Sequence, residues 1–251
     1  MTRYLFFSAL FFTFIANNGC SNKKHDQAAT LPTPASDTSN TAAGKTLPAT
    51  NPVKDPASFI PKGYVLFEKI TGDLNKDGLP DCVLIIKATD PAKLVKDEYR
   101  GELDRNRRGI VILFNKNNGY ELAEKNYDCF SSENEDGGVY FAPELSATIS
   151  KGNLYLSYGH GRYGDWSYTF RFNNTGFELI GYDASHNNGP VINRQTSINF
   201  LTGKKQEKVN TNENADSGEE VFKETRTGIP VKALIKLADI KDFEELDRHE
   251  W

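Results

Sequence analysis

The sequence predicts a mainly β domain: an antiparallel meander, arranged as a curved sheet, an open barrel or a sandwich, with one or two short helices. The first observation is a series of short segments in which Val, Ile, Leu, Phe and Tyr are dense or alternate with polar residues, as is typical of strands. The second is that clusters of turn residues separate these segments at intervals of roughly ten residues. Short strands joined by tight turns indicate a meander.

Nine segments fit the strand pattern. Three are dense in Val, Ile, Leu and Phe, and six alternate apolar with polar residues. The dense segments are 63–70, 82–88 and 109–115, and the alternating ones are 120–127, 145–150, 153–160, 166–173, 177–183 and 197–203. The hairpin-like turns between them are 115–119, 151–153, 173–176 and 202–205.

Only two segments have helical character. Residues 90–103 begin with Asp90 as an N-cap, Pro91 at the first helical position and Leu94 as an apolar contact. Residues 230–246 fit a helix, a final strand or an extended tail, because they alternate Ile and Leu with polar residues. The polar segment 206–224 is predicted to be a loop.

The first nineteen residues are predicted to be an export signal. Arg3 precedes an apolar run from Leu5 to Ala16, which is the arrangement of a cleavable signal peptide. A helix of this run would be about 18 Å long, too short for a bilayer core of about 30 Å.

Cys20 follows the apolar run directly after Gly19, and this ending resembles the lipobox of bacterial lipoproteins. The resemblance implies that the Cys20 thiol is acylated with diacylglycerol and becomes the new N-terminus; Asn17 and Asn18 depart from the usual lipobox residues. Residues 21–58 are rich in Ala, Thr, Pro, Ser and Asn, which predicts a disordered tether. The expected organisation is a signal peptide at 1–19, a lipidated Cys and tether at 20–58, and one β-rich domain at 59–251.

The other two cysteines are Cys82 and Cys129, and export would place them in an oxidising compartment. They either form a disulfide or remain two small buried hydrophobic residues in neighbouring strands.

The stretch "TGDLNKDGLPDCVLII" (71–86) places oxygen ligands at alternate positions. Calcium takes six to eight oxygen ligands, and a glycine allows the sharp turn that brings a backbone carbonyl to the ion. The predicted ligands are the side chains of Asp73, Asn75, Asp77 and Asp81 and the backbone carbonyl of Leu79, around Gly78. A metal-free turn rich in Asp and Asn is the alternative.

The same stretch resembles the calcium loop of FG-GAP or VCBS-type repeats, in which such a loop joins two antiparallel strands. The resemblance covers residues 62–86 and occurs once, so it implies a structural calcium loop but no β-propeller. Two further stretches, "SYTFRFNNTGFELIGYD" and "SINFLTGK", resemble segments of exported bacterial proteins of unknown function, which implies no activity.

Two other segments are candidate functional sites. In "YGHGRYGDWSY" (158–168), glycines are interleaved with residues favoured at interaction surfaces; the alternative is a wide hairpin whose aromatic residues pack on the sheet. The residues of this candidate binding surface are His160, Arg162, Tyr163, Asp165 and Trp166. The segment 131–145 carries Glu133, Glu135 and Asp136, which predicts a solvated acidic loop or a second cation site.

The composition narrows the function classes. A formal net charge of -4 gives no general attraction to nucleic acid. Arg105, Arg107 and Arg108, beside two acidic residues, predict a solvated charged loop. No Ser/His/Asp set or zinc-ligand spacing is visible among the four histidines.

We therefore expect a lipid-anchored lipoprotein of the bacterial cell envelope, facing the periplasm or attached to the outer membrane. Its membrane partner would be reached through the lipid, its cofactor would be one structural Ca²⁺, and its ligand would be a protein or a glycan. An envelope hydrolase that uses Glu133, Glu135 and Asp136 on glycan or peptide is the competing hypothesis, and a purely structural envelope protein is a third. The sequence leaves the oligomeric state open.

Overall fold

The structure, a computed structural model, describes residues 54–134, 142–243 and 246, all of which lie in one compact unit, Pro48–Trp251. We call this unit the β domain. The predicted signal peptide, Cys20 and most of the tether lie outside the described residues. Within the described residues the β domain is mainly antiparallel sheet with no closed barrel, which confirms the predicted fold class.

The first sheet has four antiparallel strands in the order β1-β2-β5-β6. The strands are β1 (Tyr64–Gly72), β2 (Asp81–Ala88), β5 (Arg108–Asn115) and β6 (Tyr120–Phe130), and a 3-10 turn, η1 (Pro56–Phe59), precedes them. The central strands β2 and β5 are buried along almost their whole length. Apolar clusters lie on both faces of these two strands, which explains their uninterrupted apolar sequences.

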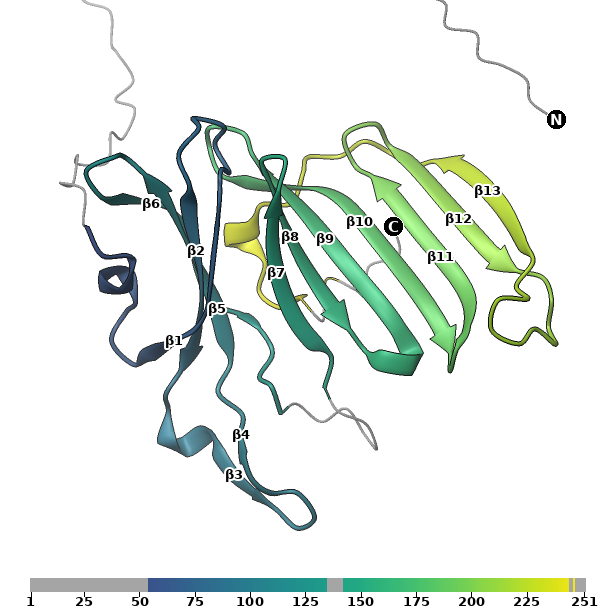
Figure 1. The fold of residues 1–251 in the computed structure, drawn as a ribbon, viewed down its shortest axis with the longest axis horizontal. Helices are drawn as coiled ribbons and strands as arrows, with labels where there is room; N and C mark the ends of the chain where they lie inside the picture. Colours follow the sequence, from purple (N-terminus) through teal and green to yellow (C-terminus); the bar gives the residue numbers. More distant parts are fainter. Residues whose placement is uncertain (1–53, 135–141, 244–245, 247–251) are drawn as a thin grey trace, which may run out of the picture. The chain divides into compact units, whose positions relative to one another are not determined.

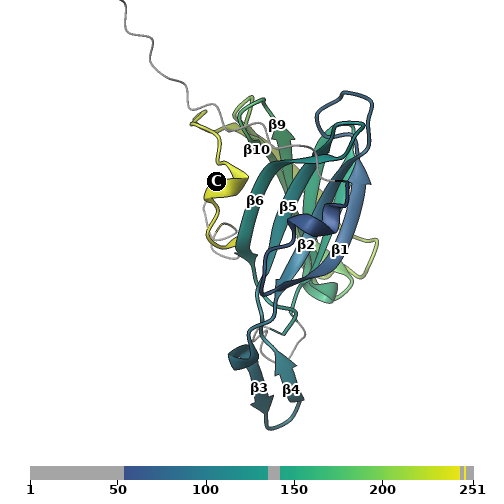
Figure 2. The same cartoon turned by 90° about the vertical axis from the view of Figure 1, so that its left-hand side faces the viewer.

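Between β2 and β5 the chain forms a 3-10 turn, η2 (Pro91–Lys93), and a small hairpin of β3 (Leu94–Asp97) and β4 (Gly101–Asp104), visible at the bottom of Figure 2. The Asp90 carboxylate caps the turn by accepting from Ala92 N at 2.9 Å. The cap was predicted correctly, but the helix expected over 90–103 was wrong: the helical turn ends after three residues.

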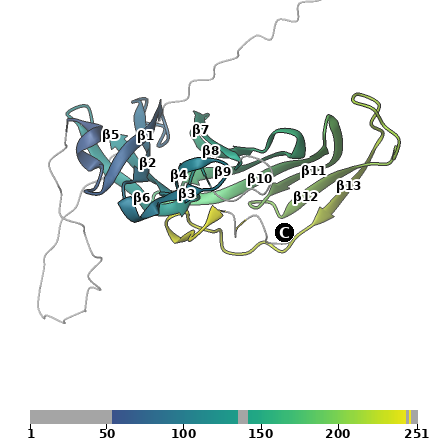
Figure 3. The ribbon, with the colours of Figure 1, turned by 90° about the horizontal axis from the view of Figure 1, so that it is seen from below.

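The second sheet has seven strands in strict chain order, from β7 to β13 (Figure 1). The strands are β7 (Glu144–Ser150), β8 (Asn153–Gly159), β9 (Gly164–Phe172), β10 (Phe177–Asn188), β11 (Val191–Asn199), β12 (Lys204–Asn210) and β13 (Phe222–Gly228), with a 3-10 turn, η3 (Gly161–Tyr163), between β8 and β9. The loop predicted over 206–224 is correct for residues 211–221 and wrong at its two ends, which lie in β12 and β13. Figure 3 shows this sheet as a curved layer.

The main core lies between the two sheets and includes the C-terminal segment. Residues of β2, β5 and β6 pack with residues of β8, β9 and β10 and with Leu237, Ile240 and Phe243. The segment left open by the sequence, 230–246, runs without regular structure to an isolated bridge between Glu178 and Lys236, and then to a 3-10 turn, η4 (Leu237–Asp239). Within the described residues it is neither a long helix nor a strand.

A second, smaller apolar cluster covers the other face of the four-stranded sheet. Cys82 belongs to this cluster, whereas Cys129 belongs to the main core. Both are buried and free, so the structure corrects the disulfide alternative and supports two small buried side chains. Burial raises the pKa of both thiols, which keeps them in the unreactive protonated form.

Candidate functional site

The predicted calcium loop joins β1 to β2 and is wound tightly by its own side chains. Asp73 Oδ2 accepts from Gly78 N at 3.0 Å, Asn75 Oδ1 accepts from Asp77 N at 3.0 Å, and Asp77 Oδ1 accepts from Leu79 N at 2.9 Å. Gly78 has a φ of +85°, the backbone conformation for which glycine is suited. The bond from the Leu79 N–H, with a second from Asn75, holds the pKa of Asp77 below its usual value.

One oxygen in this loop is left without a hydrogen bond. Asp73 Oδ1 is buried and has no hydrogen-bond donor among the described residues. A buried carboxylate oxygen without a partner is costly unless a cation or a donor satisfies it. The loop therefore fits the calcium prediction at Asp73, beside the oxygens of Asn75, Asp77 and the Leu79 backbone.

Asp81 has a different role from the predicted one. Its side chain is fully buried, and its two carboxylate oxygens accept from Leu74 N at 2.8 Å, Asn75 N at 3.3 Å and Asn115 N at 3.0 Å. Burial raises the pKa of Asp81, and the bonds from these N–H groups act against that rise. Asp81 thus fastens the loop to the turn between β5 and β6.

The three acids of the loop, Asp73, Asp77 and Asp81, do not form one metal-binding cluster. In the described part of the chain no group of three or more His, Cys, Asp or Glu side chains is placed to share a metal ion. A cation bound here would be held by Asp73 and Asp77 together with the Asn75 amide oxygen and the Leu79 carbonyl. Asp81 would not contact the cation but would hold the loop backbone through its hydrogen bonds.

The predicted binding surface divides between the two faces of the seven-stranded sheet. His160, Arg162 and Tyr163, with Gly159 and Glu144, line a hollow of about 460 Å³. Asp165 lines a second hollow, of about 420 Å³. Trp166 is partly buried, stacks on Tyr158 at 5.4 Å and packs against the main core, which is the arrangement of the alternative interpretation, an aromatic residue packed on the sheet.

The two hollows lie along one face of the sheet, which we call the polar face. Residues that face one another in successive strands of an antiparallel sheet share a face. One such row is Glu144, Gly159, Asp165, Ser185, Gln195, Lys208 and Glu224. The neighbouring row is Ser146, Ser157, Ser167, Asp183, Ser197, Gln206 and Arg226.

The composition of these rows explains why the face is hollowed. Short residues recur in both rows, at Gly159, Ser157, Ser167, Ser185 and Ser197, whereas the other face of the same strands carries Tyr168, Phe170 and Tyr182 in the core. Ser157 Oγ donates to Ser167 Oγ at 2.9 Å. The longer side chains of Gln195, Gln206 and Lys208 lie nearer the β12 end of the rows. The sequence shows the polar alternation, but the rows appear only once the strand register is known.

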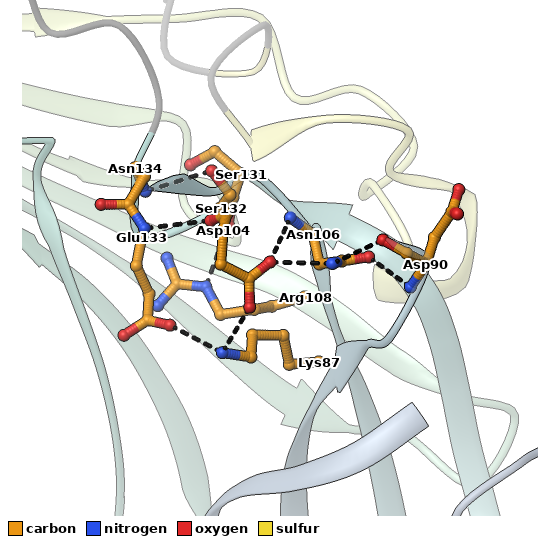
Figure 4. A network of polar contacts seen from close by, with 9 residues as sticks. All are labelled: Lys87, Asp90, Asp104, Asn106, Arg108, Ser131, Ser132, Glu133 and Asn134. Carbon is orange, nitrogen blue, oxygen red and sulfur yellow. Dashed lines mark hydrogen bonds and ion pairs between the residues drawn. The ribbon is translucent and has the colours of Figure 1, made fainter. Parts of the chain in front are cut away.

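The acidic segment after β6 is engaged in a polar network (Figure 4). Lys87 Nζ lies 3.0 Å from Asp104 Oδ2 and 3.2 Å from Glu133 Oε2. The hydrogen bond to Asp104 raises the pKa of Lys87. The Glu133 carboxylate also raises it, whereas burial of the ammonium group acts to lower it. Although burial acts to raise it, bonds from Asn106 and Lys87 hold the pKa of Asp104 below its usual value. Glu133 is thus an ion-pair partner; Glu135 and Asp136 lie outside the described residues.

The same network corrects the prediction of a solvated arginine loop. Arg108 is only 3% exposed, donates from Nε to the Ser131 carbonyl at 2.9 Å and lies over the Phe67 ring at 5.1 Å. Asn106, also 3% exposed, accepts from Asp90 N at 2.8 Å and donates to Asp104 Oδ1 at 2.8 Å. The network thus fastens the β3–β4 hairpin.

Comparisons with known proteins return no matching family model, no matching curated protein and no matching solved structure. Among the described residues, no helix is long and apolar enough to cross a membrane.

Proposed function

We propose that this protein is a lipid-anchored lipoprotein of a bacterial cell envelope whose β domain binds a glycan on the polar face of the seven-stranded sheet. The observation that carries the proposal is the pair of adjoining hollows on that face. The export signal and the lipidated Cys20, both predicted from sequence, would place this face outside the cytoplasm.

The chemistry of the polar face favours a glycan over an apolar ligand. The hollow around Asp165 is lined by carboxylate, amide, hydroxyl and ammonium groups from Asp183, Gln195, Ser197 and Lys208. Such groups must keep their hydrogen bonds when a ligand displaces water. A hydroxyl-rich ligand such as a glycan supplies both donors and acceptors.

The glycan proposal predicts that a variant of the hollow loses binding. We expect soluble peptidoglycan fragments, titrated into the isotope-labelled β domain, to shift the backbone amide resonances of β9 to β11. Asp183→Ala should abolish these shifts without lowering the unfolding midpoint, because Asp183 is exposed. Asp128→Ala, also exposed but on β6, is the control that should bind like the parent.

Two outcomes would contradict the glycan proposal. One is the absence of amide shifts with any fragment. The other is a set of shifts confined to the loops that is unchanged in Asp183→Ala. The same samples test the hydrolase hypothesis, since shortening of the fragments during the titration would show cleavage. The ion pair between Glu133 and Lys87 gives that hypothesis no support.

We further propose that the loop between β1 and β2 holds one structural Ca²⁺ through Asp73, Asn75, Asp77 and the Leu79 carbonyl. The support is the buried, unpartnered Asp73 Oδ1 beside a loop already turned by Gly78. Bound calcium would neutralise charge there and hold the loop closed.

The calcium proposal predicts a thermal shift. At a calcium concentration about 100-fold above Kd, the melting temperature of the β domain should rise by roughly 5 °C or more, since binding to the folded state alone adds about 2.7 kcal/mol. Asp73→Asn should remove the shift while keeping an acceptor for Gly78 N. Asp97→Asn is the matched control, because Asp97 also accepts backbone N–H groups in a turn, from Tyr99 and Arg100. An unchanged melting temperature in the parent would contradict the calcium proposal.

A further inference from the structure

The outer edge of β13 is open in the part of the chain that the structure describes. β13 is the last strand of the seven-stranded sheet, it pairs only with β12 there, and all seven of its residues are exposed. The opposite edge strand, β7, lies against β1: a Cβ added to Gly72 would approach Ile149 Cγ2 to 2.6 Å. An open edge presents unpaired N–H and C=O groups that can accept another strand.

The β13 sequence is complementary to itself. When two antiparallel copies pair about a two-fold axis, facing side chains share a face of the sheet, so one residue must face its own copy. With Thr225 on the axis, Glu224 faces Arg226 of the second copy, and Arg226 faces Glu224 of the second copy. Within one chain these two side chains already form an ion pair, with Arg226 Nε 2.7 Å from Glu224 Oε1. Pairing would therefore build a square of four alternating charges.

The neighbouring registers are less favourable. Moving the axis to Glu224 or to Arg226 would place two like charges directly opposite each other, which destabilises a strand pair. The Thr225 register also places Phe222 opposite Gly228 of the second copy. The surface over Gly228 is open, since a Cβ there would meet only Gly203 O at 3.9 Å, and an aromatic ring can cover a glycine across a strand pair.

We propose that two copies of the β domain associate edge to edge through β13, with Thr225 on the two-fold axis, to form one continuous antiparallel sheet. The occupant of the edge is a second copy because the charge and size pattern of β13 complements itself. The axis is perpendicular to the sheet, so both polar faces lie on the same side. This dimer stands independently of the glycan and calcium proposals.

The test uses charge exchange on the β domain, which contains the whole of both apolar clusters. Sedimentation equilibrium of the parent should show a concentration-dependent dimer. Glu224→Arg and Arg226→Glu should each weaken that dimer by about tenfold or more, because each substitution is present in both copies and so places like charges opposite each other at two positions. A mixture of the two variants should dimerise again, since both arginines of one chain then face the two glutamates of the other.

Cysteine cross-linking tests the register separately. Thr225→Cys should form an intermolecular disulfide under mild oxidation, because directly facing residues have Cα atoms about 4.5–5.5 Å apart. Thr227→Cys, on the same face and also exposed, is the matched control: its two copies would lie about 13 Å apart, beyond disulfide reach. The native thiols do not compete, since both are buried.

Three results would overturn the dimer proposal: a parent that stays monomeric at every concentration, single charge variants that dimerise like the parent, or Thr227→Cys cross-linking as readily as Thr225→Cys. Recovery of the dimer in the mixed sample, together with selective cross-linking at 225, would establish both the edge and the register.

Discussion

Phe243→Ala is expected to lower the free energy of unfolding by about 3–5 kcal/mol, the cost of removing a fully buried aromatic side chain. Phe243 is 1% exposed and lies with ring centroids 5.0 Å from Phe130, 5.2 Å from Tyr168 and 6.0 Å from Phe170. It comes from the C-terminal segment, whose described residues join the seven-stranded sheet through the isolated bridge between Glu178 and Lys236, so the packing of this ring is expected to hold the segment in place. Urea unfolding of the β domain followed by fluorescence would measure the change.

The matched control for Phe243 is Tyr99→Ala, because Tyr99 is an aromatic residue with 89% exposure in the β3–β4 hairpin. Its loss should change the free energy of unfolding by less than about 0.5 kcal/mol. Similar effects from the two variants would show that the C-terminal segment does not stabilise the core.

The second large effect is expected at Asp81. Asp81→Ala removes the acceptor for the N–H groups of Leu74, Asn75 and Asn115. Each buried donor left without a partner costs about 1–3 kcal/mol, so the free energy of unfolding should fall by about 3 kcal/mol or more. Amide hydrogen exchange should also quicken at Asn115, whose N–H is bonded to this carboxylate.

Asp97→Ala separates the burial of Asp81 from the general effect of losing a carboxylate. Asp97 also accepts backbone N–H groups, but in an exposed turn where water can replace it. We expect a loss of less than about 1 kcal/mol. If Asp81→Ala were as mild, the link between the loop and the β5–β6 turn would be unimportant for stability.

The strands were predictable because their signals are local. Apolar density and alternation identified the nine segments, and all nine contain or overlap strands of the structure. The loop predicted over 206–224 was wrong at its two ends because β12 and β13 bury little: β12 is ordered by backbone pairing with β11, and β13 by pairing with β12, so their polar composition resembles that of a loop.

The helix expected over 90–103 failed for a tertiary reason. The Asp90 carboxylate can cap a three-residue turn as well as a long helix, so the cap does not determine where the helical segment ends. Asn106 then bonds to both Asp90 and Asp104, which requires the two ends of the segment to lie close together. A helix of that length would separate them by about 20 Å, whereas a hairpin brings them together.

The site could be predicted only where its parts are near in sequence. Asp73, Asn75 and Asp77 are close neighbours, so their loop was found. The anchoring role of Asp81 depends on Asn115, 34 residues away, and no local pattern marks that pair. The side of the sheet on which Trp166 lies could not be predicted, because alternation leaves open which side of a strand meets the core.

The separation of Cys82 and Cys129 by a sheet has a consequence for biogenesis. If the chain emerges unfolded into an oxidising space, as we propose, both thiols are accessible before the sheets assemble. A bridge formed at that moment would join residues that the native fold places in different clusters. The yield of native protein would then depend on whether the chain folds faster than the two thiols are oxidised. A chain cross-linked too early would stay misfolded until thiol–disulfide exchange broke the bridge.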